Sequence, residues 1–179
     1  MIIGQQIYLR PITLSDTDLI IKWRNSESVK SRFIYQSLFT RESQQEWMKT
    51  QVDTGKTVQM IICEKETNRE IGSAYIRDID RVHQKAEYGL FIGEDTQRGH
   101  GIGTEVGSLM LNYAFEVLEL HRIYSRVLSN NIASLISAKR AGLREEGLFR
   151  DDVFMDGQYL DVVFLGALNP KEVENEAIN

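Results

Sequence analysis

The pattern of apolar and polar positions predicts the strands of this chain. Residues 7–12 alternate and predict a first strand, and residues 58–66, which begin with the apolar run VQMIIC, and 71–79 predict two more around a polar turn. The remaining predicted strands are 86–93, 122–128, 148–155 and 158–168. The last two flank Asp156-Gly157, a pair that favours the tight turn of a β-hairpin.

Apolar residues spaced three to four positions apart predict the helices. One such stripe runs from Val106 to Val117 and predicts a helix with a single buried face. A helix ends near Asn25, Thr40 can cap another over 41–52, and Gly142 ends a third over 133–141. The resulting order, β-α-α-β-β-β-α-β-α-β-β, predicts an α/β fold with a mixed sheet of the α+β kind. We expect one domain over 1–170 and a polar tail over 171–179.

Composition and charge narrow the class of protein. The chain has 179 residues and a net charge of −5, which argues against a protein that coats nucleic acid. No stretch approaches the roughly 18 apolar residues of a membrane-spanning helix, and the N-terminus lacks the pattern of a signal peptide. The single cysteine, Cys63, lies in an apolar run and is expected to be a buried strand thiol. We therefore expect a cytoplasmic protein with no membrane or nucleic-acid partner.

A glycine-rich segment, QRGHGIGTEVG at 97–107, leads directly into the helix that begins near residue 104. It does not fit the dinucleotide fingerprint GxGxxG, because Val106 stands where the third glycine belongs. A second segment, TGKT at 54–57, resembles the end of a phosphate-binding P-loop, but Thr50 replaces the required first glycine. The chain therefore contains neither of these two common nucleotide-binding motifs.

The segment 97–107 still has the properties of an anion-binding turn. The first N–H groups of a helix lack partners within the helix, and glycines let an anion approach them closely. Arg98 adds a fixed positive charge with several donors. The alternative is a tight strand-to-helix turn in which Arg98 and His100 are solvated. The segment alone leaves both interpretations open.

The segment 98–103, RGHGIG, resembles motif A of the GNAT N-acetyltransferases, [QR]-x-x-G-x-[GA]. The resemblance extends over most of the chain and keeps the family's order of segments. AEYGLFIG resembles the family's fourth strand, NIASLISAKRAGLREEG its motif B, and FMDGQYLDVVFLGAL its closing hairpin. The N-terminal LRPITLSD and WRN are similar to a branch that contains ribosomal-protein and spermidine acetyltransferases and enzymes acting on sugar nucleotides.

This resemblance implies the GNAT acyl-CoA N-acyltransferase fold and acetyl-CoA as cosubstrate. The backbone around the glycines would hold the pyrophosphate, the end of the fourth strand would bond the pantetheine arm, and motif B would contribute from its helix. The residues at the matching positions are Phe91, Ile92, Gly93, Arg98, Gly99, His100, Gly101, Ile102, Gly103, Thr104, Asn131, Ser134 and Lys139. For Asn131 and Ser134, ordinary helix capping is an alternative that can coexist with this role.

Acetyl transfer to an amine needs a base that accepts the amine's proton. Glu87 is the candidate, because it lies on the same strand face as Gly89 and Phe91. The alternative is a structural carboxylate that is exposed or paired with Lys85 or Arg126. The family's usual general acid is a tyrosine in motif B, and this chain has Ala138 there.

The sequence specifies the amine that accepts the acetyl group less closely than it specifies the acetyl donor. Arg24, Asn25 and Tyr75 are candidates to contact it, and the acceptor is a small amine or polyamine, an amino sugar nucleotide or a protein N-terminus. The histidines show no metal-ligand spacing, so no metal is expected. A homodimer through the edges of the closing hairpin is expected. Because of Ala138, a CoA-binding module with lost or regulatory activity is the alternative function.

Overall fold

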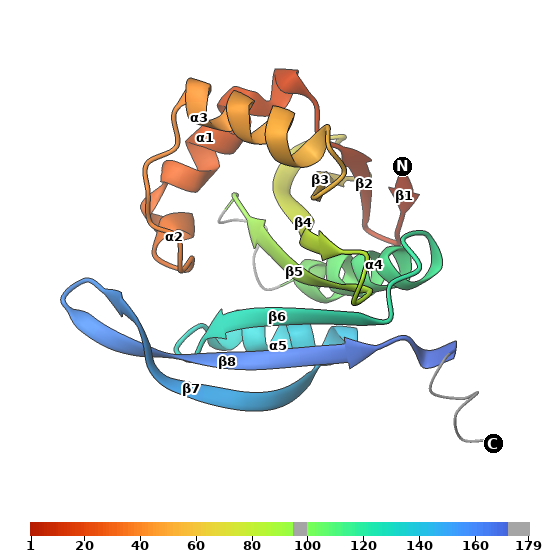
Figure 1. The fold of residues 1–179 in the computed structure, drawn as a ribbon. Helices are drawn as coiled ribbons and strands as arrows, with labels where there is room; N and C mark the ends of the chain where they lie inside the picture. The colour runs from red at the N-terminus through yellow and green to blue at the C-terminus, as the bar shows by residue number, and fades with distance from the viewer. Residues whose placement is uncertain (95–99, 172–179) are drawn as a thin grey trace.

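A computed structural model of the chain describes residues 1–94 and 100–171, and within them eight strands form one mixed sheet (Figure 1). The strand order in the sheet is β1-β2-β3-β4-β5-β6-β8-β7. The strands are β1 (Ile2–Ile3), β2 (Ile7–Pro11), β3 (Val58–Glu64), β4 (Glu70–Asp80), β5 (Lys85–Ile92), β6 (Arg122–Leu128), β7 (Arg144–Met155) and β8 (Gln158–Leu168). The predicted fold class is confirmed, and β1 is an additional strand that the sequence pattern did not indicate.

Helices cover both faces of the sheet. One face carries α1 (Thr17–Asn25), α2 (Glu27–Lys30) and α3 (Arg41–Trp47), and the other carries α4 (Ile102–Glu116) and α5 (Ile132–Ala141) (Figure 1). A short 3-10 helix, η1 (Leu14–Asp16), precedes α1, and a π-helical turn, η2 (Met48–Val52), continues α3. The predicted second helix is thus present, although its last turn is wider than an α-helix. Thr40 caps it as expected, by accepting a hydrogen bond from the Ser43 N–H.

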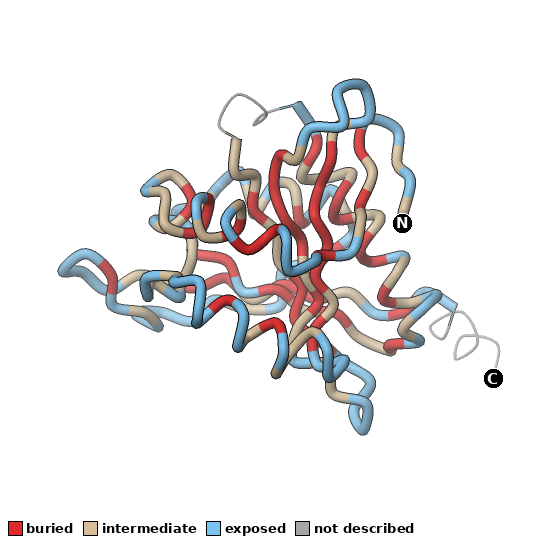
Figure 2. Tube along the Cα trace, turned by 90° about the horizontal axis from the view of Figure 1, so that it is seen from above, coloured by how far each residue is buried: buried red, intermediate tan, exposed pale blue. Residues whose placement is uncertain are grey.

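The core lies on both sides of the central strands (Figure 2). In β3, Met60 and Ile62 pack in the cluster that includes α4, whereas Ile61 and Cys63 pack against α1 and the end of α3. A strand that is covered on both faces reads as a continuous apolar run, which is why VQMIIC shows no polar alternation. Cys63 is the buried strand thiol that the sequence predicted, and burial raises its pKa.

The sheet divides into two halves that are joined only between β5 and β6. These parallel strands pair over three residues, Lys85–Glu87 with Arg122–Tyr124, and then both continue without pairing to each other. The strands therefore diverge after Glu87 and Tyr124. On the far side, β7 and β8 form the predicted hairpin, in which Asp156 and Gly157 both adopt positive φ, at 51° and 81°. Of the predicted tail, 171–179, only residue 171 lies among the described residues.

Close packing of α4 on α5 gives a prediction for stability. Gly107 is buried between the helices, and a Cβ there would lie 2.6 Å from the Ala141 Cβ. We expect Gly107→Val to push the helices apart and to lower the free energy of unfolding by about 1–3 kcal/mol, measured by urea denaturation. The control is Gly147→Val in β7, because a Cβ at Gly147 meets nothing within 4 Å. Equal stability of the two variants would refute the close packing of α4 on α5.

Candidate active site

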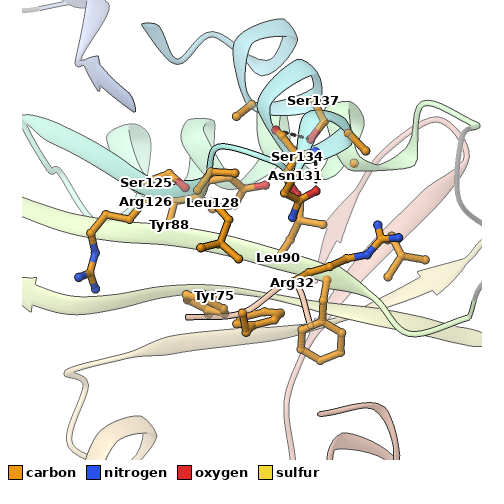
Figure 3. A pocket seen from close by; sticks show the side chains of 18 of the residues that line it. Arg32, Tyr75, Tyr88, Leu90, Ser125, Arg126, Leu128, Asn131, Ser134 and Ser137 are labelled. Atoms are coloured by element: carbon orange, nitrogen blue, oxygen red, sulfur yellow. Dashed lines mark hydrogen bonds between the residues drawn. The ribbon is translucent and has the colours of Figure 1, made fainter. Parts of the chain in front are cut away.

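A cleft of about 340 Å³ opens where β5 and β6 diverge. Its walls come from the end of β5, from β6, from the first turn of α4, from α5 and from the segment after α2. Figure 3 shows Asn131, Ser134 and Ser137 on the α5 wall, with Tyr75 and Arg32 on the opposite side. The cleft thus collects residues from segments far apart in the sequence.

The structure brings most of the predicted CoA-binding residues to this cleft. Those that line it are Phe91, Ile92, Gly101, Ile102, Gly103, Thr104, Asn131 and Ser134. Arg98 and Gly99 lie outside the described residues. His100 is exposed, and it is not among the described residues that line the cleft.

Two predicted residues are placed elsewhere. Gly93 packs against Trp23 instead of lining the cleft, and a Cβ at Gly93 would lie 2.3 Å from that ring. Lys139 also stays out of the cleft, because it pairs with Glu145 at 2.7 Å. Its neighbour Arg140, about 100° further around the helix, lines the cleft in its place. Since both side chains are cationic, no signal in the sequence distinguishes them.

The first turn of α4 presents backbone N–H groups that have no backbone partner among the described residues. Gly101 caps the helix with a φ of 81°, a conformation that favours glycine. The first intrahelical bond runs from the Thr104 N–H to the Gly101 carbonyl, at 3.0 Å. The N–H groups of Ile102 and Gly103 precede this bond and carry the partial positive charge of the helix start. On α5, Asn131 caps the helix by accepting from the Ser134 N–H at 3.3 Å, as the sequence predicted.

Glu87 lies at the point where β5 and β6 part, and its carboxylate binds two arginines. Arg77 Nε and Arg126 Nη2 each donate a hydrogen bond to Oε2 at 3.0 Å, and Arg77 Nη2 forms an ion pair with the same oxygen at 2.9 Å. Oε1 receives one bond, from Arg126 Nε at 3.2 Å. Glu87 is 3% exposed and lines the cleft. The sequence anticipated Arg126 as a partner but missed Arg77, which faces Glu87 in the β4–β5 register.

Tyr75 lies across the strand pair from Gly89, and its ring occupies the space that a side chain at Gly89 would need. Burial raises the pKa of Tyr75, and the nearby Arg77 and Arg24 partly oppose this rise. Tyr88, the next residue along β5 from Glu87, has a buried hydroxyl with no hydrogen-bond partner among the described residues. Burial raises the pKa of Tyr88 as well.

A second pocket, of about 350 Å³, adjoins the cleft beneath α1 and α3. The two cavities share the lining residues Phe33, Tyr35, Tyr75, Arg77 and Phe91. Arg24, a predicted acceptor contact, lines this pocket. Asn25 does not line it, because its side-chain amide exchanges two 2.8 Å hydrogen bonds with the Phe39 backbone and fixes the loop after α2.

Neither a metal-binding cluster nor a membrane-spanning helix is found in the part of the chain that the structure describes. In 1–94 and 100–171, no group of three or more His, Cys, Asp or Glu side chains could hold a metal ion. Within these ranges, none of the helices is both long and apolar enough to span a membrane.

The family model for the acetyltransferase (GNAT) domain matches residues 6–144. The chain belongs to the GNAT acetyltransferase family. The resemblance seen in the sequence is therefore confirmed, and so are the predicted N-acetyltransferase activity and acetyl-CoA as the acetyl donor. The geometry suits this cosubstrate, because the N–H groups of Ile102 and Gly103 have no backbone partner in the described part of the chain and lie beside Gly101.

Similar proteins agree with this family. The chain is 29% identical over 180 residues to a probable N-acetyltransferase, YjcK, of Bacillus subtilis, covering 96% of this chain and 99% of that protein. It is 24% identical over 168 residues to the spermidine N(1)-acetyltransferase of Vibrio cholerae, covering 94% and 96%. A crystal structure of spermidine N-acetyltransferase from Vibrio cholerae in complex with CoA and spermine superposes with a TM-score of 0.86. That match, at 23% identity over 94% of this chain and 98% of the other, shows the shared fold.

Proposed function

We propose that this GNAT enzyme transfers the acetyl group of acetyl-CoA directly to a primary amine at the junction of the cleft and the second pocket. The observation that carries the proposal is the continuity of the two cavities around Tyr75 and Arg77, next to Glu87. The cleft contains the start of α4, where Gly101 and the backbone N–H groups suit the pyrophosphate of CoA. The second pocket meets the cleft at Tyr75 and Arg77. Small amines, amino sugar nucleotides and protein N-termini are the acceptor classes to test.

The donor would be held from both walls of the cleft. The amides at 101–103 would bind the pyrophosphate together with Arg98 and Gly99, which the sequence motif supports. The backbone of Phe91 and Ile92 would bond the pantetheine arm, and Asn131, Ser134 and Arg140 would contribute from α5. These residues share one cavity in the structure, except the two that lie outside the described ranges.

Gly101 gives a test of this arrangement that has an internal control. Gly101 and Gly55 both have positive φ, at 81° and 72°, and a Cβ at either meets nothing within 4 Å. Alanine at either position should cost about 1–2 kcal/mol of stability through backbone strain. We expect only Gly101→Ala to raise the Kd for CoA, by about tenfold, measured by calorimetry. An unchanged Kd in Gly101→Ala, or an equal rise in Gly55→Ala, would refute the role of this turn.

Glu87 is the proposed general base, and its geometry indicates which atom acts. Two hydrogen bonds and a further ion-pair contact converge on Oε2, whereas Oε1 receives one hydrogen bond, so Oε1 has the lone pair available for a proton. The thiol of CoA resembles that of cysteine, whose pKa is about 8.5, so it can leave largely as thiolate. A general acid is then useful but not required, which is consistent with Ala138 lining the cleft.

An acetylation screen tests the proposal directly. Purified protein and acetyl-CoA are incubated with amines of the three classes, and free CoA thiol is measured together with the mass of each amine. The proposal requires that thiol release depends on the amine and matches the acetylated product. Tight CoA binding with no acetylated amine in any class would instead favour the second candidate, a CoA-binding module without catalysis, which Ala138 motivates.

A homodimer and a cytoplasmic location are also part of the proposal. The β7–β8 hairpin exposes apolar side chains that a second copy of the chain could cover, namely Leu148, Phe149, Phe154 and Tyr159. The chain has a single, buried cysteine, which suits a reducing compartment. Light scattering measures the first of these properties in solution.

A further inference from the structure

The second pocket contains a buried positive charge, Arg24, that has no counter-ion among the described residues. Arg24 is 8% exposed, and its Nη1 has no hydrogen-bond partner among the described residues. Its Nη2 makes one long bond, 3.4 Å to the Tyr35 carbonyl. In the described ranges, 1–94 and 100–171, no carboxylate forms an ion pair with Arg24. Burying a charge of this kind is strongly unfavourable unless a ligand supplies an opposite charge and accepts its hydrogen bonds.

Aromatic rings hold the guanidinium in place without satisfying its donors. The Arg24 Cζ lies 3.6 Å from the Phe33 ring centroid, 4.8 Å from that of Phe39 and 5.9 Å from that of Phe91. Such contacts stabilise the cation through the ring faces, but they do not accept its in-plane N–H groups. Burial and the charge of Arg77 lower the pKa of Arg24 to about 10, so the group is still protonated at neutral pH.

A second unpartnered donor lines the same pocket. Gln44 on α3 is 2% exposed, and its Nε2 has no hydrogen-bond partner in the part of the chain that the structure describes. Buried polar groups are almost always hydrogen-bonded, so two orphan donors from different helices in one cavity call for a common explanation. The described residues that line the pocket include no Asp or Glu. The other arginine among them, Arg77, has carboxylate partners, because it forms ion pairs with Glu87 and Asp78.

We propose that this pocket binds an anionic group of the acceptor, a carboxylate or a phosphate, with Arg24 and Gln44 as its hydrogen-bond donors. The inference rests on the proposed function and names the class of substrate: an amine that also carries a negative charge. With the anion beside Arg24, the amine extends past Tyr75 and Arg77, which line both cavities, towards Glu87. A guanidinium can bind either anion through parallel N–H bonds.

The same geometry selects against polyamines. A polycation placed in this pocket would bring its charges next to Arg24, and the described lining offers no carboxylate to receive them. Like charges in a desolvated site repel strongly. The chain therefore differs in expected acceptor from the spermidine acetyltransferases that it resembles in sequence and fold.

Matched acceptor pairs test the proposal on the wild-type enzyme. One arm compares a free amino acid with its methyl ester, a second compares aminoethyl phosphate with aminoethanol, and spermidine is the polycation. We expect kcat/KM to favour the anionic member of at least one pair by more than tenfold and to be lowest for spermidine. The arm that shows the preference identifies carboxylate or phosphate. Equal or faster acetylation of the neutral amines or of spermidine would overturn the inference while leaving the proposed function intact.

Anion binding can also be measured without turnover, which separates this inference from the failure of the proposed function. Saturating CoA fills the cleft, and inorganic phosphate or acetate is then titrated while the Tm is followed. We expect at least one of the two anions to raise the Tm of the wild type and to have no effect on Arg24→Met or Gln44→Leu. The control Arg41→Met removes an exposed arginine of α3 that pairs with Asp18, and it should keep the response. No response of the wild type to either anion, or an unchanged response in Arg24→Met, would overturn the inference.

The Tm of Arg24→Met without ligand distinguishes an arginine that binds a ligand from one that stabilises the fold. Since methionine removes a buried charge without a counter-ion, we expect its Tm without ligand to equal or exceed that of the wild type. A structural arginine would instead give a lower Tm, because its contacts with the three aromatic rings would be lost. If the variant does not fold, that result counts against the inference, and the wild-type titration and acceptor pairs still decide it.

Discussion

Glu87→Gln is expected to lower kcat/KM for the acceptor by roughly 10²–10⁴-fold, the usual contribution of a general base. The Kd for CoA should stay the same. Glutamine keeps the shape of the side chain and can still accept hydrogen bonds from Arg77 and Arg126, but it cannot take up the proton of the attacking amine. The measurement is steady-state kinetics over a range of acceptor concentrations, with CoA affinity determined separately by calorimetry.

The dependence of kcat/KM on pH shows whether Glu87 acts as the base or only orients Arg77 and Arg126. If Glu87 is the base, the fall of kcat/KM towards acidic pH should be lost or shifted in the variant. The control is Glu146→Gln in β7, which removes the carboxylate partner of Arg122 in the other half of the sheet. It should leave both the rate and the profile unchanged. Wild-type turnover in Glu87→Gln would contradict the proposed role.

Gly89→Ala is the second change with a large expected effect, at about 10²-fold in kcat/KM for the acceptor. A Cβ at Gly89 would lie 2.3 Å from the hydroxyl oxygen of Tyr75, so the tyrosine ring must move. This ring borders both cavities, and Arg77 lies over it with its Cζ 5.2 Å from the ring centroid. A single methyl group should therefore misplace the junction at which donor and acceptor meet.

A double-mutant cycle shows whether the clash with Tyr75 is the cause. Adding Tyr75→Ala to Gly89→Ala removes the clash, so the effects of the two changes should be clearly less than additive. Tyr75→Phe keeps the ring and removes the hydroxyl, so it reports separately on any proton transfer by that group. The control Gly147→Ala adds a methyl in open space and should be silent. Additive effects in the cycle would show that Gly89 acts by another route.

The sequence predicted the fold well because the signals that define it are local. The capping threonine Thr40 and the Asp156-Gly157 turn act within a few residues, and both behave as predicted. The family motif also located the helix start at Gly101 and the cap at Asn131. The strand β1 escaped prediction because two residues show no periodicity, and its pairing with Tyr8 and Leu9 depends on the sheet.

The parts of the site that the sequence missed depend on contacts between distant segments. Arg77 meets Glu87 through the register of two strands, and Arg140 replaces Lys139 because of the rotation of α5 against the sheet. Arg24 was a candidate from its place at the end of α1, but its missing counter-ion became visible only with the surrounding loop and α3 in place. Asn25, its neighbour, proved to fix that loop.

The central claim is that acetyl-CoA in the β5–β6 cleft acetylates an amine that enters from the second pocket. The most direct measurement is mass spectrometry of candidate amines after incubation with acetyl-CoA and the enzyme, with CoA thiol release followed in parallel. The account predicts that an anionic amine gains one acetyl group for each thiol released. Release of thiol without an acetylated amine, or CoA binding with no transfer to any amine, would contradict it.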